Sequence, residues 1–258
     1  MRQLLRRLYL LYHELRPRGS EYSYVIDTSL FERHVDLFVK LSAAGPDSVG
    51  LWPAVTFDDG HISNYELAAP VLLAHGLSAH FFITVGWTGT KAGYMGWDEL
   101  RALHGAGHTI GAHGWTHTLL THCGDTQLQK ELGGSRRELE DRLGAAVTTM
   151  SLPGGRYDQR VLAACEAAGY EHVFTSEPRT EALPLGATVG RLNVRGDAQV
   201  EWMTRLLDPA SGVLQGLQRK ERMKAAARRL LGDTLYARLW AMANRQERGG
   251  DGDEARAE

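Results

Sequence analysis

Runs of apolar residues recur along the chain, and segments with helical spacing separate them. We predict strands in the runs at residues 8–13, 54–57, 79–84, 108–112, 148–152, 172–175 and 189–194. Strands that alternate with helices favour a parallel sheet joined by crossover helices. About seven such units would nearly close an α/β barrel, and an open doubly wound sheet is the competing architecture.

The segments between the strands have apolar stripes of helical period. In residues 30–41, Leu30, Phe38 and Leu41 lie on one face of a predicted helix. Residues 158–168 form a second predicted helix, which Gly169 ends as a residue suited to the left-handed C′ position.

The pattern changes after residue 210, where one side becomes apolar and the other basic. Lys and Arg recur from residue 219 to residue 238, and the apolar side holds Met223, Leu230, Leu231, Leu235, Leu239 and Trp240. We therefore predict a barrel over residues 1–210, a helical extension over residues 211–247 that packs on it, and a disordered tail over residues 248–258. A basic amphipathic helix also fits a membrane surface, so peripheral membrane contact is the alternative role of the extension.

Composition excludes several classes of protein. The 258 residues carry 29 Lys and Arg against 31 Asp and Glu, and this balance argues against non-specific nucleic-acid binding as the main activity. No apolar run approaches the roughly 20 residues that span a bilayer, and the short apolar stretch after the basic N-terminus does not form a signal-peptide core. The two cysteines form neither a CxxC motif nor a disulfide framework, so we expect a cytoplasmic location, with a membrane-peripheral one as the alternative.

Two neighbouring carboxylates follow the strand predicted at residues 54–57. Asp58 and Asp59 stand directly before Gly60, at the carboxyl end of the strand, where parallel α/β folds hold their active sites. Taken alone, Asp-Asp-Gly is more often a turn with solvated acids.

Two histidines follow the strand predicted at residues 108–112. His113 and His117, four residues apart on a helical turn, would face the same way and could offer two imidazole nitrogens to one metal. Two histidines and one carboxylate from different strand ends leave a coordination position open for water. This ligand set suits Zn²⁺, and Co²⁺, Ni²⁺, Mn²⁺ and Fe²⁺ fit it as well.

Taken together, these motifs resemble the polysaccharide deacetylases with a NodB-homology domain, carbohydrate esterase family four. Thr-Phe-Asp-Asp-Gly at residues 56–60 is similar to the first family motif, His-Gly-Trp-Thr-His at residues 113–117 to the second, and Leu-Pro-Gly-Gly at residues 152–155 to the third. The likeness runs from about residue 10 to about residue 194. It implies a distorted (β/α) barrel and metal-dependent removal of acetyl groups from N-acetylated sugars.

The resemblance also implies roles for individual residues. Asp58 would be the catalytic base, and the metal ligands would be Asp59, His113 and His117. The third motif would form one wall of the substrate groove through Pro153, Gly154 and Gly155. Trp115, inside the histidine motif, is our candidate for stacking on a sugar ring, although large aromatic residues more often belong to the core.

Three positions depart from the family pattern. Gly114 stands where a Ser or Thr hydroxyl commonly braces the loop. Ser151 stands where an Arg commonly orients the base, so we expect Asp58 to be oriented by another cation or to have a different pKa. The last predicted strand lacks the histidine of the Leu-x-His motif that supplies the general acid.

His13 ends the first predicted strand, where its ring would face the same mouth of the barrel. The Tyr-His pair at residues 12–13 resembles the start of the poly-N-acetylglucosamine deacetylases, a branch that also departs from the usual acid motif. We expect His13 to be the general acid or a donor that orients the substrate, with His122 as the second choice. The alternatives are a structural His13 and an Asp58 that carries the proton in both directions.

These observations predict a metal-dependent hydrolase that removes N-acetyl groups from an amino-sugar glycan or a glycan precursor. Two other readings stay open: a catalytically weak carbohydrate-binding or scaffold protein on the same barrel, and an amidase or esterase that acts on a small molecule. Release of acetate from N-acetylated oligosaccharides would separate them.

Overall fold

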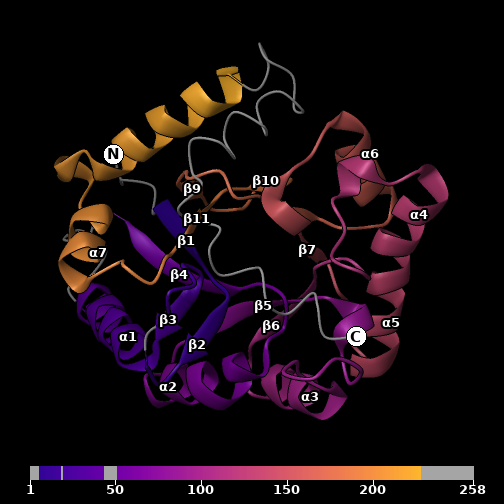
Figure 1. Ribbon diagram of the computed structural model, residues 1–258, viewed down its shortest axis with the longest axis horizontal. Coiled ribbons are helices and arrows are strands. Elements are labelled where there is room, and N and C mark those ends of the chain that lie inside the picture. Colours follow the sequence, from indigo (N-terminus) through magenta and orange to yellow (C-terminus); the bar gives the residue numbers. More distant parts are fainter. Residues whose placement is uncertain (1–5, 19, 44–50, 228–258) are drawn as a thin grey trace.

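The computed structural model describes residues 6–18, 20–43 and 51–227. Its main feature is a mostly parallel sheet that curves into a nearly closed barrel, with helices around the outside (Figure 1). This arrangement confirms the predicted barrel over the open doubly wound sheet. The strands of this sheet are β1 (Arg6–Tyr12), β4 (Trp52–Phe57), β5 (Ala79–Ile83), β6 (Thr109–Ala112), β7 (Thr149–Ser151), β8 (His172–Phe174), β9 (Glu181–Ala182), β10 (Thr188–Val189) and β11 (Arg191–Asn193).

One bent strand brings the two edges of the sheet together. The strand order is β10-β8-β7-β6-β5-β4-β1-β11, and β9 runs antiparallel along the start of β1. Because Gly190 alone separates β10 from β11, this stretch pairs with β8 on one side and with β1 on the other. Counted once, it completes seven parallel strands, as predicted. A β-carbon at Gly190 would lie 2.6 Å from the backbone oxygen of Glu177, so the bend has room only for glycine.

The helices connect the strands and cover the outside of the barrel (Figure 1). They are α1 (Thr28–Ala43), α2 (Ala69–Ala74), α3 (Trp97–Gly105), α4 (Asp125–Gln129), α5 (Ser135–Leu143), α6 (Gln159–Ala167) and α7 (Val200–Leu207). Short 3₁₀ and π segments are η1 (Asn64–Ala68), η2 (Val85–Trp87), η3 (Leu120–His122), η4 (Lys130–Gly134), η5 (Pro153–Gly155) and η6 (Pro209–Ser211). The helices predicted at residues 30–41 and 158–168 correspond to α1 and α6. A small parallel sheet of β2 (Glu14–Arg16) and β3 (Val25–Asp27) was not predicted.

The core has two parts because side chains alternate across each strand. On β1, Leu8, Leu10 and Tyr12 join the large cluster between the sheet and the helices. Tyr9 points to the other face and packs in a smaller cluster with Phe82, Phe174 and Val189, which fills the barrel interior. Strands buried on both faces explain why the sequence shows continuous apolar runs.

Residues 213–227 are helical and lie along the rim of the barrel near β9 and β11 (Figure 1). Leu214 is buried and Leu217 packs against the core, whereas Met223, which we placed on the apolar side of the extension, is 72% exposed. The expected apolar side is therefore wrong at Met223, because the helix turns this residue to solvent. The rest of the extension, its other apolar positions and the tail lie outside the described residues, so the division into domains stays a prediction. Within the described part of the chain, no helix combines the length and the apolar character of a membrane span.

Candidate active site

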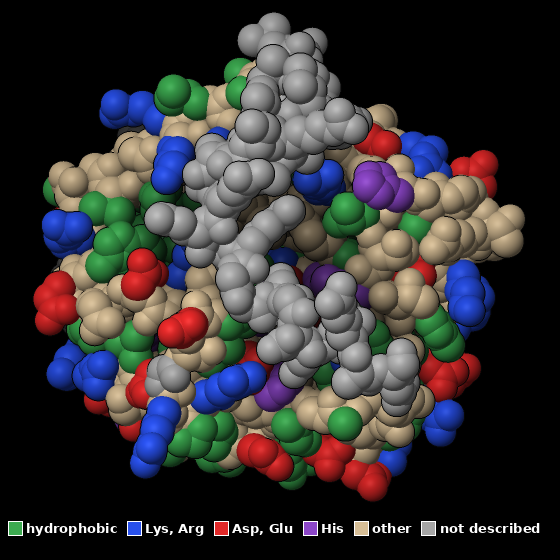
Figure 2. Space-filling model, in the orientation of Figure 1, with side chains coloured by type: hydrophobic (Ala, Val, Ile, Leu, Met, Phe, Trp, Pro, Cys, Tyr) green, Lys and Arg blue, Asp and Glu red, His purple; other side chains and the backbone are tan. Residues whose placement is uncertain are grey.

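The carboxyl ends of β4 and β6 bring Asp59, His113 and His117 together. Oδ1 of Asp59 lies 3.3 Å from Nε2 of His113 and 3.2 Å from Nε2 of His117. One ligand atom from each residue lies within 4.8 Å of the others. A tetrahedral ion with ligands at about 2.1 Å holds its ligand atoms about 3.4 Å apart, so the observed spacing suits a metal. Figure 2 shows histidine side chains near the centre of this face of the molecule.

The surroundings of His113 and Asp59 leave the atoms that face each other able to bind a cation. Nδ1 of His113 lies 2.9 Å from the backbone oxygen of Ser151, which can only accept, so Nδ1 carries a proton and Nε2 is the nitrogen left to bind a cation. Oδ1 of Asp59 is buried and accepts no hydrogen bond from the described residues. A buried carboxylate oxygen of this kind is unfavourable without a cation, so these residues fit a divalent metal.

Burial and the neighbouring charges shift the pKa values of Asp59 and His113. Burial raises the pKa of Asp59, but the adjacent imidazoles of His113 and His117 outweigh it and hold that pKa well below its usual range. Burial lowers the pKa of His113, and the carboxylates of Asp58 and Asp59 outweigh it and raise that pKa. Asp59 therefore stays ionised at neutral pH, as a metal ligand must.

Two residues of the group have left-handed backbone. The φ angles are 73° at Asp59 and 60° at His117, in a region that residues other than glycine rarely occupy. Such strained positions persist where the surrounding contacts fix them, and they cluster at functional sites.

Glu131 binds the loop of residues 113–117, which we call the histidine loop. This loop has Gly114 at the position where the family commonly has the hydroxyl of a Ser or Thr. The carboxylate of Glu131 is buried and accepts hydrogen bonds from the backbone nitrogen of Trp115 at 2.7 Å, and from the nitrogen and Oγ1 of Thr116 at 2.9 and 2.6 Å. Gly114 has a φ of 76°, and a β-carbon there would lie 2.9 Å from Oε2 of Glu131. Glycine thus makes room for the acid that replaces the hydroxyl.

Arg191 is the cation that the sequence leads us to expect beside Asp58. It comes from β11, is fully buried, and donates from Nη1 to Oδ1 of Asp58 at 2.7 Å and from Nη2 to Oδ2 at 2.8 Å. Ser151 donates its hydroxyl to Oδ2 of Asp58 at 2.9 Å and accepts from Nη2 of Arg191 at 2.6 Å. The arginine expected at position 151 is therefore replaced by one from another strand, bound to the same carboxylate.

Asp58 lies beside the metal group without belonging to it. Its Oδ2 is 3.9 Å from Nε2 of His113. Burial raises the pKa of Asp58, but the charges of Arg191 and His113 outweigh it and lower that pKa. Asp58 is therefore an ionised carboxylate in a fixed orientation, next to a position where a metal can bind water.

His13 lies between β1 and β2, among the charged groups of the site. Burial lowers the pKa of His13 more than the carboxylates of Asp59 and Asp58 raise it, and Nδ1 is buried without a hydrogen-bond partner among the described residues. The lowered pKa favours the neutral ring, which can donate a hydrogen bond, and the role of His13 as general acid stays a prediction. His122, the second choice, is exposed on η3.

The residues predicted to contact the substrate differ in how far they are buried. Residues 154–155 line a cavity, whereas Pro153 is buried. Trp115 is half-buried and packs against the core, an environment typical of a structural aromatic residue. Trp87, also half-buried, places its ring 5.2 Å from that of His117. A sugar-stacking role for Trp115 stays a prediction.

Comparisons with known proteins agree with this geometry. Residues 52–173 match the family described as polysaccharide deacetylase. YxkH of Bacillus subtilis (strain 168), whose name proposes a polysaccharide deacetylase, is 32% identical over 124 residues, which cover 48% of this chain and 44% of that protein. Chitin deacetylase 1 of Cryptococcus neoformans var. grubii is 27% identical over 129 residues, which cover 50% of this chain and 26% of that protein. Residues 52–173 are thus similar to polysaccharide deacetylases, over a little less than half of the chain.

Solved structures share the fold of this chain at low sequence identity. The Streptococcus pyogenes deacetylase PplD in complex with acetate aligns with a TM-score of 0.69 and 18% identity, over 80% of this chain and 100% of that one. IcaB from Ammonifex degensii aligns with a TM-score of 0.62 and 20% identity, over 82% and 97% of the two chains. The chain spans less than half the length of the two curated relatives above, so its activity has to be argued from its own residues.

Two residues of the site escaped the sequence reasoning. Arg191 is the one charged residue in the strand predicted at residues 189–194, and this charge was the available signal. Glu131 stands in a polar helical segment, where nothing distinguishes it from its exposed neighbours.

Proposed function

We propose that this chain is a metal-dependent N-deacetylase that hydrolyses the acetamide group of an amino-sugar glycan or glycan precursor. The observation that carries the proposal is the position of Asp58, held by Arg191, beside Asp59, His113 and His117. The deacetylase relatives support hydrolysis of an amide bond.

Asp59, His113 and His117 would hold the metal. A divalent ion bound there supplies a Lewis acid that polarises the amide carbonyl and lowers the pKa of water. Asp58 accepts the proton of the attacking water, since its carboxylate is ionised and Arg191 fixes both oxygens. General-base catalysis of this kind contributes about 10²–10⁴ in rate.

The amine that leaves has to receive a proton. Asp58 can return the proton that it accepted, because it lies beside the reacting groups throughout. The neutral ring of His13 offers a hydrogen bond that orients the substrate. We therefore assign proton transfer in both directions to Asp58 and substrate orientation to His13.

A comparison of variants at Asp58 and Asp59 tests this proposal most directly. Metal-loaded Asp58→Asn should retain its metal and lose about 10²–10⁴ in kcat with little change in KM, because the lost interaction acts in the transition state. Asp59→Asn should instead lower metal occupancy, measured by elemental analysis after dialysis. Acetate release from N-acetylglucosamine oligosaccharides gives the rates. An unchanged kcat in Asp58→Asn would remove Asp58 from the mechanism, and metal-loaded wild-type protein that releases no acetate would refute the proposed activity.

A further inference from the structure

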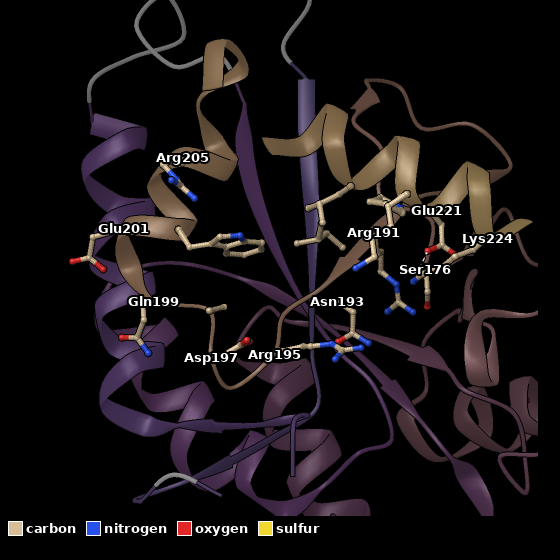
Figure 3. A pocket seen from close by; sticks show the side chains of 16 residues that line it. Ser176, Arg191, Asn193, Arg195, Asp197, Gln199, Glu201, Arg205, Glu221 and Lys224 are labelled. Carbon is tan, nitrogen blue, oxygen red and sulfur yellow. Dashed lines mark hydrogen bonds and ion pairs between the residues drawn. The ribbon is translucent and has the colours of Figure 1, made fainter. Parts of the chain in front are cut away.

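A groove runs between the barrel and the helix of residues 213–227. One cavity of about 780 Å³ is lined by residues of β11, the loop after it, α7 and this helix (Figure 3). A second cavity of about 530 Å³ continues it to residues 154–155, and the two share Ser176, Pro178, Glu221 and Lys224. We call the two cavities together the helix groove. Each is in the range of about 300–1,000 Å³ that is typical of ligand sites.

The helix groove adjoins the candidate base. Arg191, which holds Asp58, also forms part of the groove wall, and Asn193 follows it on the same strand. Gly154 and Gly155, the last two residues of the third motif, border the other cavity. A glycan with one acetamide group at Asp58 can therefore extend its neighbouring sugars into this groove.

Positive charge is concentrated along the helix groove. The lining residues include eight cations, Arg156, Arg179, Arg191, Arg195, Arg205, Lys220, Arg222 and Lys224. They include four acids, Glu177, Asp197, Glu201 and Glu221. The lining thus holds four more cations than acids, in a chain whose formal net charge is −2, and two of these cations also pair with acids outside the lining, Arg191 with Asp58 and Arg179 with Glu181. Figure 3 shows Arg205 on the α7 side of the first cavity and Lys224 on the opposite side.

Half of these cations form no ion pair with the described residues. Arg179 and Arg191 form ion pairs with acids. In the part of the chain that the structure describes, no acid lies within ion-pair distance of Arg156, Arg205, Lys220 or Arg222. Unpaired cations along a concave surface attract anions and raise their local concentration.

Other side chains of the helix groove suit a sugar chain. Trp202 of α7 is half-buried and packs partly against the core, and it also lines the first cavity, where aromatic surface can contact a sugar ring. Asn193, Gln199 and Ser176 line the same cavity and can exchange hydrogen bonds with sugar hydroxyls.

We propose that the helix groove binds an anionic part of the glycan, with phosphate or carboxylate groups on the sugars next to the one whose acetamide reaches Asp58. This inference rests on the proposed deacetylase function and narrows its substrate to N-acetylated glycans that carry negative charge. The shared chemistry of the ligand is an oxyanion on a sugar, and the probes below distinguish its two sources.

Matched tetrasaccharides test the proposal by calorimetric titration of the full, metal-loaded chain. The probes are neutral tetra-N-acetylchitotetraose, its 1-phosphate, and a tetrasaccharide of alternating N-acetylglucosamine and glucuronic acid. At low salt at least one anionic probe should bind about tenfold more tightly than the neutral one, and high salt should remove the difference. A preference for the phosphate or for the carboxylate probe identifies the source of the charge.

Two charge reversals on the same helix supply the control. Lys220→Glu, in the wall of the groove, should weaken binding of the preferred anionic probe about tenfold and leave the neutral probe within about twofold. Arg219→Glu makes the same change of charge at an exposed position outside both cavities and should have less than a threefold effect, roughly. Equal affinities for neutral and anionic probes, or equal effects of the two reversals, would overturn the proposal.

Acetate release, measured separately, distinguishes the two proposals. If no sugar is deacetylated but the preference for an anionic probe depends on Lys220, the proposed activity fails and the anionic site stands. If the neutral tetrasaccharide is deacetylated equally by wild type and Lys220→Glu, and no probe shows a charge preference, the activity stands and the anionic site fails.

Discussion

Replacement of Arg191 by methionine removes the cation bound to the buried carboxylate of Asp58. Arg191 is 0% exposed and Asp58 3% exposed, and the guanidinium also donates to the backbone oxygen of Thr175 at 3.2 Å. Methionine fills much of the space but leaves Asp58 as an uncompensated charge in the interior. Removal of one partner of a buried ion pair costs about 3–5 kcal/mol, so we expect a loss of this size in the free energy of unfolding at neutral pH.

The loss in the free energy of unfolding should depend on pH, in a direction that follows from the pKa of Asp58. In the wild type, Arg191 and His113 together hold the pKa of Asp58 below its unfolded value against the effect of burial, so this stabilisation is complete above the unfolded pKa and is lost as the pH falls. Burial raises the pKa of Asp58, and Arg191 counteracts this effect. Without Arg191 that pKa is therefore higher, and the carboxylate takes up a proton more readily in mild acid. The difference between wild type and Arg191→Met should therefore be smaller at about pH 5 than at about pH 7.

Urea denaturation of metal-depleted protein, followed by circular dichroism, measures these free energies. Arg33→Met, at an exposed arginine of α1, is the matched control and should cost less than about 0.5 kcal/mol. The double variant Arg191→Met/Asp58→Asn has neither buried charge, so its loss should be smaller than the sum of the single losses by about 2–3 kcal/mol. The reasoning is refuted if Arg191→Met costs no more than Arg33→Met, or if the single losses add.

Three further predictions follow from the same contacts. Glu131→Gln should weaken zinc binding about tenfold in a chelator competition titration, because an amide cannot accept all the hydrogen bonds that the carboxylate receives from the histidine loop; unchanged affinity would show that the loop does not need this acid. Burial lowers the pKa of His34 to about 4, below its unfolded value, so its contribution to stability is complete above the unfolded pKa and is lost as the pH falls toward 4. At about pH 5 the loss should be about 2 kcal/mol, seen as a smaller gap between wild type and His34→Gln in urea denaturation than at about pH 7; a constant gap would contradict it. His13→Gln should raise KM and keep the alkaline limb of the kcat/KM profile, and disappearance of that limb would instead make His13 the general acid.

The sequence predicts the ends of β4 and β6 well because the information there is local. Each strand is a short apolar run, and Asp58, Asp59 and His113 follow directly after it. Parallel strands present their carboxyl ends at one edge, so the convergence of these groups follows from the fold class alone. The first strand is also predicted closely, and His13 lies directly after it.

Contacts between distant segments could not be predicted in this way. Arg191 and Asp58 are 133 positions apart, and their pairing depends on the bent strand that joins the two edges of the barrel. Glu131 reaches the histidine loop from the π segment η4, whose bulge no local pattern indicates. The sheet of β2 and β3 has three residues in each strand, too few for a periodic pattern. Trp115 was a natural candidate for sugar contact by its position, but its packing is decided by tertiary neighbours.

The bend at Gly190 makes the barrel seam, where β10 and β11 join the two edges of the sheet, a condition for the orientation of the base. β10 has two residues and β11 three, so few backbone hydrogen bonds hold this seam, and its opening would also displace Val189 from the smaller core cluster. Each such opening would separate Arg191 from Asp58 and expose the carboxylate to water. Opening of the seam would thus stop turnover because Asp58 loses its orientation, while the metal ligands after β4 and β6 stay in place. Glu181 accepts a hydrogen bond from the nitrogen of Gly190 at 2.6 Å, so a residue far from the chemistry influences how often the base is ready to act.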